Sequence, residues 1–199
     1  MLNAPKRPDK DHVIWRYISL DKYLDLLLTE SIKFTQVDIA ADQLEISLML
    51  NSLEKSGKLI GKEYIVGGAN FHIDMLRKSH YISCWTGKEH ECRSLWFAYL
   101  GESRIGVAIK TTVGKFIQSI DWEEFGFDYR KVDYRNVFED TEELQVNTTL
   151  LNVKAPAYSS ESEIRFTINK NLIELPDGEL SELNPPRKVP IESLPKVIA

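Results

Sequence analysis

The chain has 199 residues, 43% of them hydrophobic and 28% charged, with a net charge of −5 at neutral pH. These values exclude collagen, coiled-coil and disordered proteins. The acidic balance and the interspersed Lys and Arg residues disfavour nucleic acid as a partner, because nucleic-acid-binding proteins cluster basic side chains. No apolar run approaches about twenty residues and no secretory leader follows Met1, so we expect a cytoplasmic protein without membrane contact.

The first predicted elements follow a loose, proline-bearing lead-in at residues 1–11. Residues 13–18 (VIWRYI) are rich in β-branched and aromatic side chains and predict a strand. Leucines at helical spacing predict a helix over residues 20–31, and a short strand follows at 32–36. A second helix is predicted over residues 42–56 and ends at a glycine.

The rest of the chain predicts a growing share of strands. Helices are expected near 70–78, at 93–100 and at 113–120, and strands at 80–85, 104–111, near 127–135, at 149–155, at 161–168 and near the end of the proline-rich tail. Strands alternate with helices early and cluster late. This order favours a single α+β domain over residues 12–199, with a mixed or mainly antiparallel central sheet and several flanking helices.

Arg16 is the most unusual residue of the first predicted strand. Side chains alternate along a strand, so Arg16 shares its face with two isoleucines, while Trp15 and Tyr17 lie on the other face. A guanidinium inside such a strand needs a carboxylate or an anionic ligand, because burying it unpaired is costly. We therefore expect Arg16 to pair with Glu161 or Glu163, or to hold a ligand.

The segment ESEIRFTI (161–168) alternates polar and apolar residues. As a strand it would place Glu161, Glu163 and Arg165 on one face. Two neighbouring carboxylates repel, so one of them could have a raised pKa that suits acid–base catalysis. The alternative is a solvated sheet face with a cross-strand ion pair.

Two pairs of residues, each three apart on a predicted helix, are ambiguous. Trp96 and Tyr99 form either part of the core or a platform for a ligand. Asp42 and Glu45 are either charges favoured by the helix dipole or carboxylates of a site. The candidate ligand contacts are therefore Tyr17, Ser83, Trp85, Trp96, Tyr99, Lys154, Arg165, Asp42 and Glu45.

The string SCWT ends a predicted strand, where a loop can expose Ser83 and Trp85. Cys84 lies between these two residues and Cys92 follows eight positions later; both are predicted to be free thiols in a reducing compartment. Together with His90 they make an incomplete zinc-ligand set, so no metal site is expected from them.

These segments together resemble a bacterial family known as domain of unknown function 2971, over most of the chain. The matching pieces are WRYISLDKYLDLLL, the blocks YISCW, SLWFAYL and RIGVAIK, a V-x-Y at Val132 and Tyr134, and a closing set of Lys154, Tyr158, Glu161, Glu163 and Arg165. The chain departs from the family pattern at Ala41, where asparagine is common, at Tyr158, where tryptophan is usual, and near Arg104, where histidine is frequent. The resemblance implies a shared fold and suggests an accessory role such as defence, but no reaction.

A strand with Arg followed by Tyr, a serine at a strand end and a late E-x-E also resemble the Arg–Ser–Glu pattern of ADP-ribosyltransferases. That resemblance implies NAD as the ligand: Arg16 would hold its diphosphate or ribose, and Ser83 would brace the site. Glu163 would stabilise the oxocarbenium-like ribose as nicotinamide leaves, and Glu161 would orient the acceptor.

Two other functions are open at this stage. A metal-dependent phosphodiesterase or nuclease could use Asp42, Glu161, Glu163 and Lys154, since two or three carboxylates suffice to bind Mg²⁺. A non-catalytic module could instead bind a small molecule, a nucleotide or a partner protein through its aromatic side chains. The oligomeric state does not follow from these residues.

Overall fold

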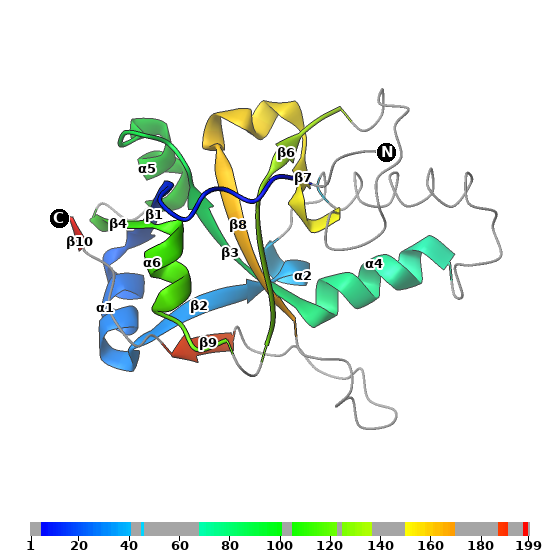
Figure 1. Cartoon of the computed structure of the whole chain (residues 1–199), viewed down its shortest axis with the longest axis horizontal. Helices are drawn as coiled ribbons and strands as arrows, with labels where there is room; N and C mark the ends of the chain where they lie inside the picture. Colours follow the sequence, from blue (N-terminus) through cyan, green and yellow to red (C-terminus); the bar gives the residue numbers. More distant parts are fainter. Residues whose placement is uncertain are drawn as a thin grey trace.

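The structure is a computed structural model that describes residues 5–40, 45, 68–100, 105–122, 125–136, 150–169, 187–190 and 197–198. Within this part of the chain, helices pack around a mainly antiparallel sheet, as Figure 1 shows. The chain therefore forms the predicted single α+β domain. Among the described residues, no helix combines the length and the apolar character needed to cross a membrane.

The described elements up to residue 100 agree with the sequence prediction, apart from the short helix α2 (Val37–Ala40), which was not predicted. They are β1 (Val13–Ser19), α1 (Leu20–Thr29), β2 (Ser31–Gln36), α2 (Val37–Ala40), α4 (Gly68–Ser79), β3 (His80–Thr86) and α5 (Arg93–Leu100). Ser19 is the N-cap of α1, and Glu30 ends the helix in a left-handed conformation. The predicted helix at 42–56 lies outside the described residues, apart from Glu45, which is helical.

The later elements differ from the prediction in two places. They are β4 (Gly106–Thr112), α6 (Val113–Gln118), β5 (Gly126–Lys131), β6 (Asp133–Tyr134), η2 (Leu150–Asn152), β7 (Val153–Lys154), η3 (Pro156–Glu161), β8 (Glu163–Asn169), β9 (Arg187–Pro190) and β10 (Val197–Ile198). Of the strand expected at 149–155, residues 150–152 form the 3-10 helix η2 and residues 153–154 form β7. Glu161, expected in a strand, lies in the 3-10 helix η3. Pro156 opens η3, where its missing N–H is no loss.

Eight of the described strands form one sheet. Its main path runs β10-β4-β1-β3-β2-β9, and β8 and then β5 continue from β3. β1 pairs with β4 from Val13 to Ser19, but within the described residues it pairs with β3 only at Trp15 and Thr86. β2 pairs with β3 at Thr35 and Gln36. All these pairings are antiparallel.

This pairing leaves a gap in the sheet, which we call the sheet opening. It is bordered by residues 16–19 of β1, 31–34 of β2 and 83–85 of β3, none of which pairs with another of these three strands in the described register. Helix α1 connects β1 to β2 and contacts both strands.

The two faces of the sheet carry separate cores, as the alternation in β1 predicts. The larger core contains Ile14 and Ile18, and in it the ring of Phe116 packs at a steep angle against the rings of Trp85 and Phe166. The smaller core lies on the opposite face. Its buried members are Trp15, Tyr17, Leu95 and Ala108, which join β1 and β4 to α5. Full burial of each large apolar side chain contributes roughly 1.5–3 kcal/mol to folding.

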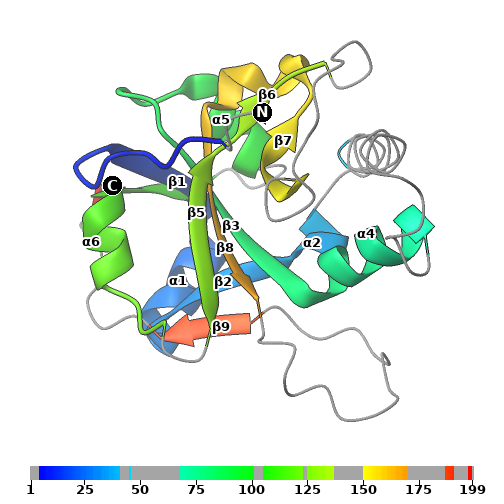
Figure 2. The same ribbon diagram turned by 45° about the vertical axis from the view of Figure 1, so that its right-hand side comes forward.

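The lead-in before β1 is less loose than the sequence predicts. In Figure 2 this segment crosses β5 on its way to β1. The carbonyl of Lys6 accepts a hydrogen bond from the Lys131 amide at 3.0 Å, and Arg7 pairs with Asp128 at 2.7 Å. Residues 5–9 therefore form no helix or strand but are fixed to the sheet.

Candidate functional site

Arg16 lies inside the sheet opening and reaches from β1 to both other walls. Its Nη1 donates a 2.7 Å hydrogen bond to Oγ of Ser83 on β3, and its Nη2 donates to the carbonyl of Lys33 on β2 at 3.2 Å. The indole Nε1 of Trp85 also donates to Ser83 Oγ, at 3.0 Å. Ser83 is thus the acceptor that fixes the guanidinium, which lies 5.8 Å from the centre of the Trp85 ring.

The prediction that Arg16 pairs with Glu161 or Glu163 is wrong. Among the ion pairs of the described residues, none includes Arg16. Burial lowers the pKa of Arg16, but a guanidinium stays charged at neutral pH because its ordinary pKa is above 12. The two described groups that accept its hydrogen bonds, a hydroxyl and a carbonyl oxygen, are neutral and leave its positive charge uncompensated.

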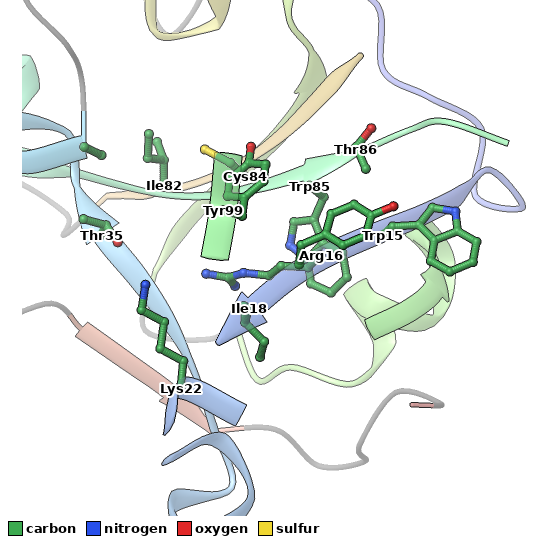
Figure 3. A pocket seen from close by; sticks show the side chains of 12 residues that line it. Trp15, Arg16, Ile18, Lys22, Thr35, Ile82, Cys84, Trp85, Thr86 and Tyr99 are labelled. Atoms are coloured by element: carbon green, nitrogen blue, oxygen red, sulfur yellow. The ribbon is translucent and has the colours of Figure 1, made fainter. Parts of the chain in front are cut away.

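A cavity of about 190 Å³, which we call the first cavity, lies beside Arg16 on the side of α5. Arg16 and Lys22 contribute two positive charges to its wall, and the described residues that line it include no carboxylate. Tyr17, Trp85 and Tyr99 supply aromatic surface. Figure 3 shows the guanidinium of Arg16 and the amine of Lys22 both pointing into the space between β1 and β2.

Tyr99 and Cys84 complete the wall of the first cavity with polar groups that stay protonated. Burial raises the pKa of the Tyr99 hydroxyl, and the negative charge of Glu163 adds to this. The Cys84 thiol has its pKa raised by the same two causes. At neutral pH both groups are uncharged hydrogen-bond donors, so the described residues that line the cavity keep a net positive charge.

A second cavity of about 490 Å³ lies beside α1 and is also lined by Arg16 and Lys22. Its other walls include Leu26, Ile32 and Ile109 from the larger core, and Asp21 and Asp25 also line it. The two cavities meet where the two cations lie.

A second group of charges is separate from Arg16 and almost completely buried. Three carboxylates surround the ammonium of Lys154, with Glu163 at 2.7 Å, Glu161 at 2.9 Å and Glu45 at 3.2 Å. Arg165 donates from Nε to Glu163 at 2.8 Å. We call these five residues the ionic cluster. Its members come from η3, β7 and β8, together with the helical residue Glu45.

The ionic cluster fixes the protonation states of its members. Burial by itself would raise the pKa of Glu163, but Arg165 and Lys154 outweigh this and hold that pKa at about 2. Burial would likewise lower the pKa of Lys154, but the carboxylates of Glu163 and Glu45 raise it overall. Glu163 is therefore an ionised, doubly paired carboxylate with 2% of its surface exposed. This is the opposite of the raised pKa that general acid–base work requires.

The strand register explains why Arg16 and Glu163 do not meet. Glu163 is paired with Thr86, and Thr86 with Trp15, so Glu163 shares the face of Trp15. Arg16 follows Trp15 and therefore points to the other face. Cys84 lies between the two groups, because it lines the first cavity and is close enough to Glu163 for that carboxylate to raise the pKa of its thiol.

Several predicted site residues are found where expected, but in different surroundings. Ser83 and Trp85, expected to be exposed at a strand end, are each 1% exposed inside β3. The face of β8 expected to be solvated is instead buried at Glu163 and Arg165. Trp96 packs edge-on against Tyr17, with 4.8 Å between the ring centroids, so it contacts a residue that lines the first cavity. Asp42 lies outside the described residues.

Two residues of the site were missed by sequence reasoning. Lys22 lies in the first turn of α1, about one helical turn beyond the strand that carries Arg16. This short spacing in the sequence could have predicted that the two cations lie near each other. Cys84 is a free cysteine, as predicted, but it was not expected to line a cavity. The described residues contain no group of three or more His, Cys, Asp or Glu side chains that could hold a metal ion.

Comparison with known proteins adds no relative to this description. No family model, no curated protein and no solved structure matches the chain. The resemblance to domain of unknown function 2971 stays a prediction based on its motifs.

Proposed function

We propose that this chain is a binding domain for a small, phosphate-bearing ligand that Arg16 holds in the sheet opening. One observation carries the proposal: a guanidinium without a carboxylate partner among the described residues lines a cavity that holds a second cation, Lys22, and no described carboxylate. A planar guanidinium suits two oxygen atoms of a phosphate, and Ser83 and Lys33 already hold it in place.

NAD is the first ligand to test. The Arg–Ser pair on which the resemblance to ADP-ribosyltransferases rests is in direct contact, with 2.7 Å between Arg16 Nη1 and Ser83 Oγ. The rings of Tyr17, Trp85 and Tyr99 give the cavity the apolar and aromatic wall typical of small-molecule sites.

ADP-ribosyl transfer is the second candidate, and it places a further demand on the chain. A carboxylate must face the ribose as positive charge develops there. Glu163 is engaged by Lys154 and Arg165, and Cys84 separates it from the first cavity. Transfer would therefore require Glu163 to leave one of these partners, so ligand binding is the function we put first.

A metal-dependent phosphodiesterase is the least supported of the three functions. The three carboxylates of the ionic cluster converge on the ammonium of Lys154, which supplies the positive charge that a divalent ion would bring. A cation in this place opposes metal binding by direct repulsion.

The proposal is tested by calorimetric titration of the purified chain with NAD and with inorganic pyrophosphate. Replacing Arg16 by Ala removes a charged hydrogen-bond donor worth about 1.5–3 kcal/mol, so we expect the affinity to fall roughly 10- to 150-fold. Arg16→Lys keeps the charge but loses the planar fork, and it should bind with intermediate affinity.

Arg7→Ala is the matched control, since Arg7 is an exposed arginine paired with Asp128 away from the opening. It should bind both ligands as the unaltered chain does. Equal binding by the Arg16→Ala and Arg7→Ala variants, each with an unchanged circular-dichroism spectrum, would overturn the proposal. Release of nicotinamide from NAD, abolished in Glu163→Gln, would favour the transferase over simple binding.

A further inference from the structure

The two cavities of the sheet opening share a single positively charged junction. Arg16 and Lys22 line both of them, together with Ile18 and Thr35. From this junction the first cavity extends toward β3 and α5, where Cys84 and Tyr99 lie. The second extends toward α1 and β4. A molecule that occupies both cavities must pass the two cations at its middle.

The two cavities also have negative charge in or behind their walls. Asp21 lines the second cavity, and its carboxylate would repel an anion beside it. Beyond Cys84, the first cavity is backed by the ionic cluster, in which three carboxylates face two cations. The attraction for an anion is therefore strongest at the junction, beside Arg16 and Lys22.

We propose that the ligand carries its negative charge at its centre, as an organic diphosphate or phosphodiester that joins two different groups. A dinucleotide is the chemical class that fits. This inference rests on the proposed function and adds to it the order of the ligand's parts: a small group in the first cavity, the phosphates at the junction, and a larger group in the second cavity.

The sizes and linings of the cavities distinguish the two ends of such a ligand. The first, of about 190 Å³, is smaller than the roughly 300–1,000 Å³ of typical ligand sites, whereas the second, of about 490 Å³, lies within that range. Tyr17 and Tyr99 suit a flat ring in the first cavity. The carboxylate of Asp21 and the hydroxyl of Ser31 in the second suit the hydroxyl groups of a sugar.

The test compares three probes that add one group at a time: inorganic pyrophosphate, ADP and NAD. We expect affinity to rise at each step by at least tenfold, because each group added to the pyrophosphate binds in a separate cavity. Two variants then block one cavity each. Ala40→Trp fills the first cavity from an exposed position, and Ser31→Trp fills the second. Ile39→Trp is the matched control, since Ile39 is exposed and lines neither cavity.

Both blocking variants should weaken NAD at least tenfold, leave pyrophosphate unchanged, and differ from the Ile39→Trp control. If either variant binds NAD as tightly as the control, or if pyrophosphate binds as tightly as NAD, the charge is not central and the inference fails. In those cases the Arg16-dependent binding of pyrophosphate would still stand. Absence of any Arg16-dependent binding would instead end the proposed function, and this inference with it.

Discussion

At the scale of single residues, Lys154 balances more negative charge than any other described side chain. Its ammonium lies within 3.2 Å of three carboxylates, and 11% of its side chain is exposed. Removing one member of a buried ion pair costs about 3–5 kcal/mol, because the partner is left buried and uncompensated. The cluster therefore constrains how η3, β7 and β8 fit together, whether or not it adds net stability.

We predict that the pairing of Glu163 makes the fold sensitive to acid. Its pKa is about 2 in the folded chain and 4.5 for an ordinary glutamate, so its contribution is complete above pH 4.5 and is lost as the pH falls toward 2. The loss should be on the order of 3 kcal/mol. Urea unfolding between pH 7 and pH 2.5 measures it. Glu163→Gln should be less stable at pH 7 and should lack this part of the acid dependence; parallel curves for the two proteins would contradict the assignment.

The two thiols should differ in reactivity by a large factor. Burial and the nearby Glu163 raise the pKa of Cys84, whereas hydrogen bonds from Ser94 and the backbone amide of Leu95 lower that of Cys92. Since the thiolate is the reactive form, iodoacetamide near pH 8 should label Cys92 first. Mass spectrometry of the intact chain and of Cys92→Ser measures this. Rapid labelling of the folded Cys92→Ser variant would show that Cys84 is ionised or exposed after all.

At the scale of elements, the ionic cluster depends on a sharp turn between η3 and β8. Ser162 makes this turn in the left-handed region, with φ of 47°, and its carbonyl accepts a 2.8 Å hydrogen bond from the amide of Gly87. The turn separates Glu161, at the end of a 3-10 helix, from Glu163, at the start of a strand, and lets both reach Lys154. For a residue other than glycine or asparagine, this backbone conformation lowers the stability of the folded chain.

Ser162→Gly should therefore stabilise the chain. The left-handed conformation costs an L-residue roughly 1–2 kcal/mol, and glycine recovers part of this against its own larger loss of entropy, so we expect a gain of up to about 1 kcal/mol. Thermal unfolding measures the change. Ser159→Gly is the control: Ser159 is exposed in the same 3-10 helix and has an ordinary φ, so its replacement should give no gain.

At the scale of the whole molecule, the sheet consists of two halves with little direct contact. One contains β10, β4 and β1, and the other contains β3, β2, β8, β5 and β9. Within the described residues the register joins them at Trp15 and Thr86, and Arg16 adds hydrogen bonds to Ser83 and Lys33. A ligand in the sheet opening would touch both halves at once.

Bound pyrophosphate should accordingly slow amide hydrogen exchange on both sides of the opening. We expect increased protection in β1 and β2, and no change in β5 and β8, which lie away from the opening and do not line either cavity. Exchange followed by mass spectrometry measures this, and the effect should vanish in Arg16→Ala. Protection confined to one half would mean that the ligand binds on one wall only.

The sequence predicts the local structure of this chain well and its charge pairing poorly, and the reason is physical. The alternation in VIWRYI assigns its two isoleucines to one face and Trp15 and Tyr17 to the other, and the two separate cores confirm this. It also singles out Arg16 as a buried charge in need of a partner. Which strand lies next to β1 is set by pairings between distant parts of the chain, and β3 separates β1 from β8. For this reason Glu163 meets Arg165 and Lys154 instead of Arg16.

The buried state of Ser83, Trp85 and Glu163 was missed for a related reason. A polar residue in a predicted strand is expected to face solvent unless the residues that pack over it are known. Here Tyr17, Tyr99 and the helical residue Glu45, which come from distant parts of the chain, lie near these side chains. The composition of the predicted strands was enough to select these residues as candidates for a site. Their grouping into a cavity and a separate ionic cluster required the three-dimensional arrangement.

The placement of Arg16 also has a consequence for synthesis on the ribosome. β1 is made early, yet its main partner begins only at Gly106, with Val13 finally pairing with Thr112. Throughout that interval the nascent chain carries a segment of five apolar or aromatic residues, one serine and one arginine. Without the arginine in its middle, this segment would be open to pairing with other molecules. A charged residue inside an apolar segment opposes such aggregation. The guanidinium that we propose to hold a ligand in the folded chain would thus also oppose aggregation of the nascent chain.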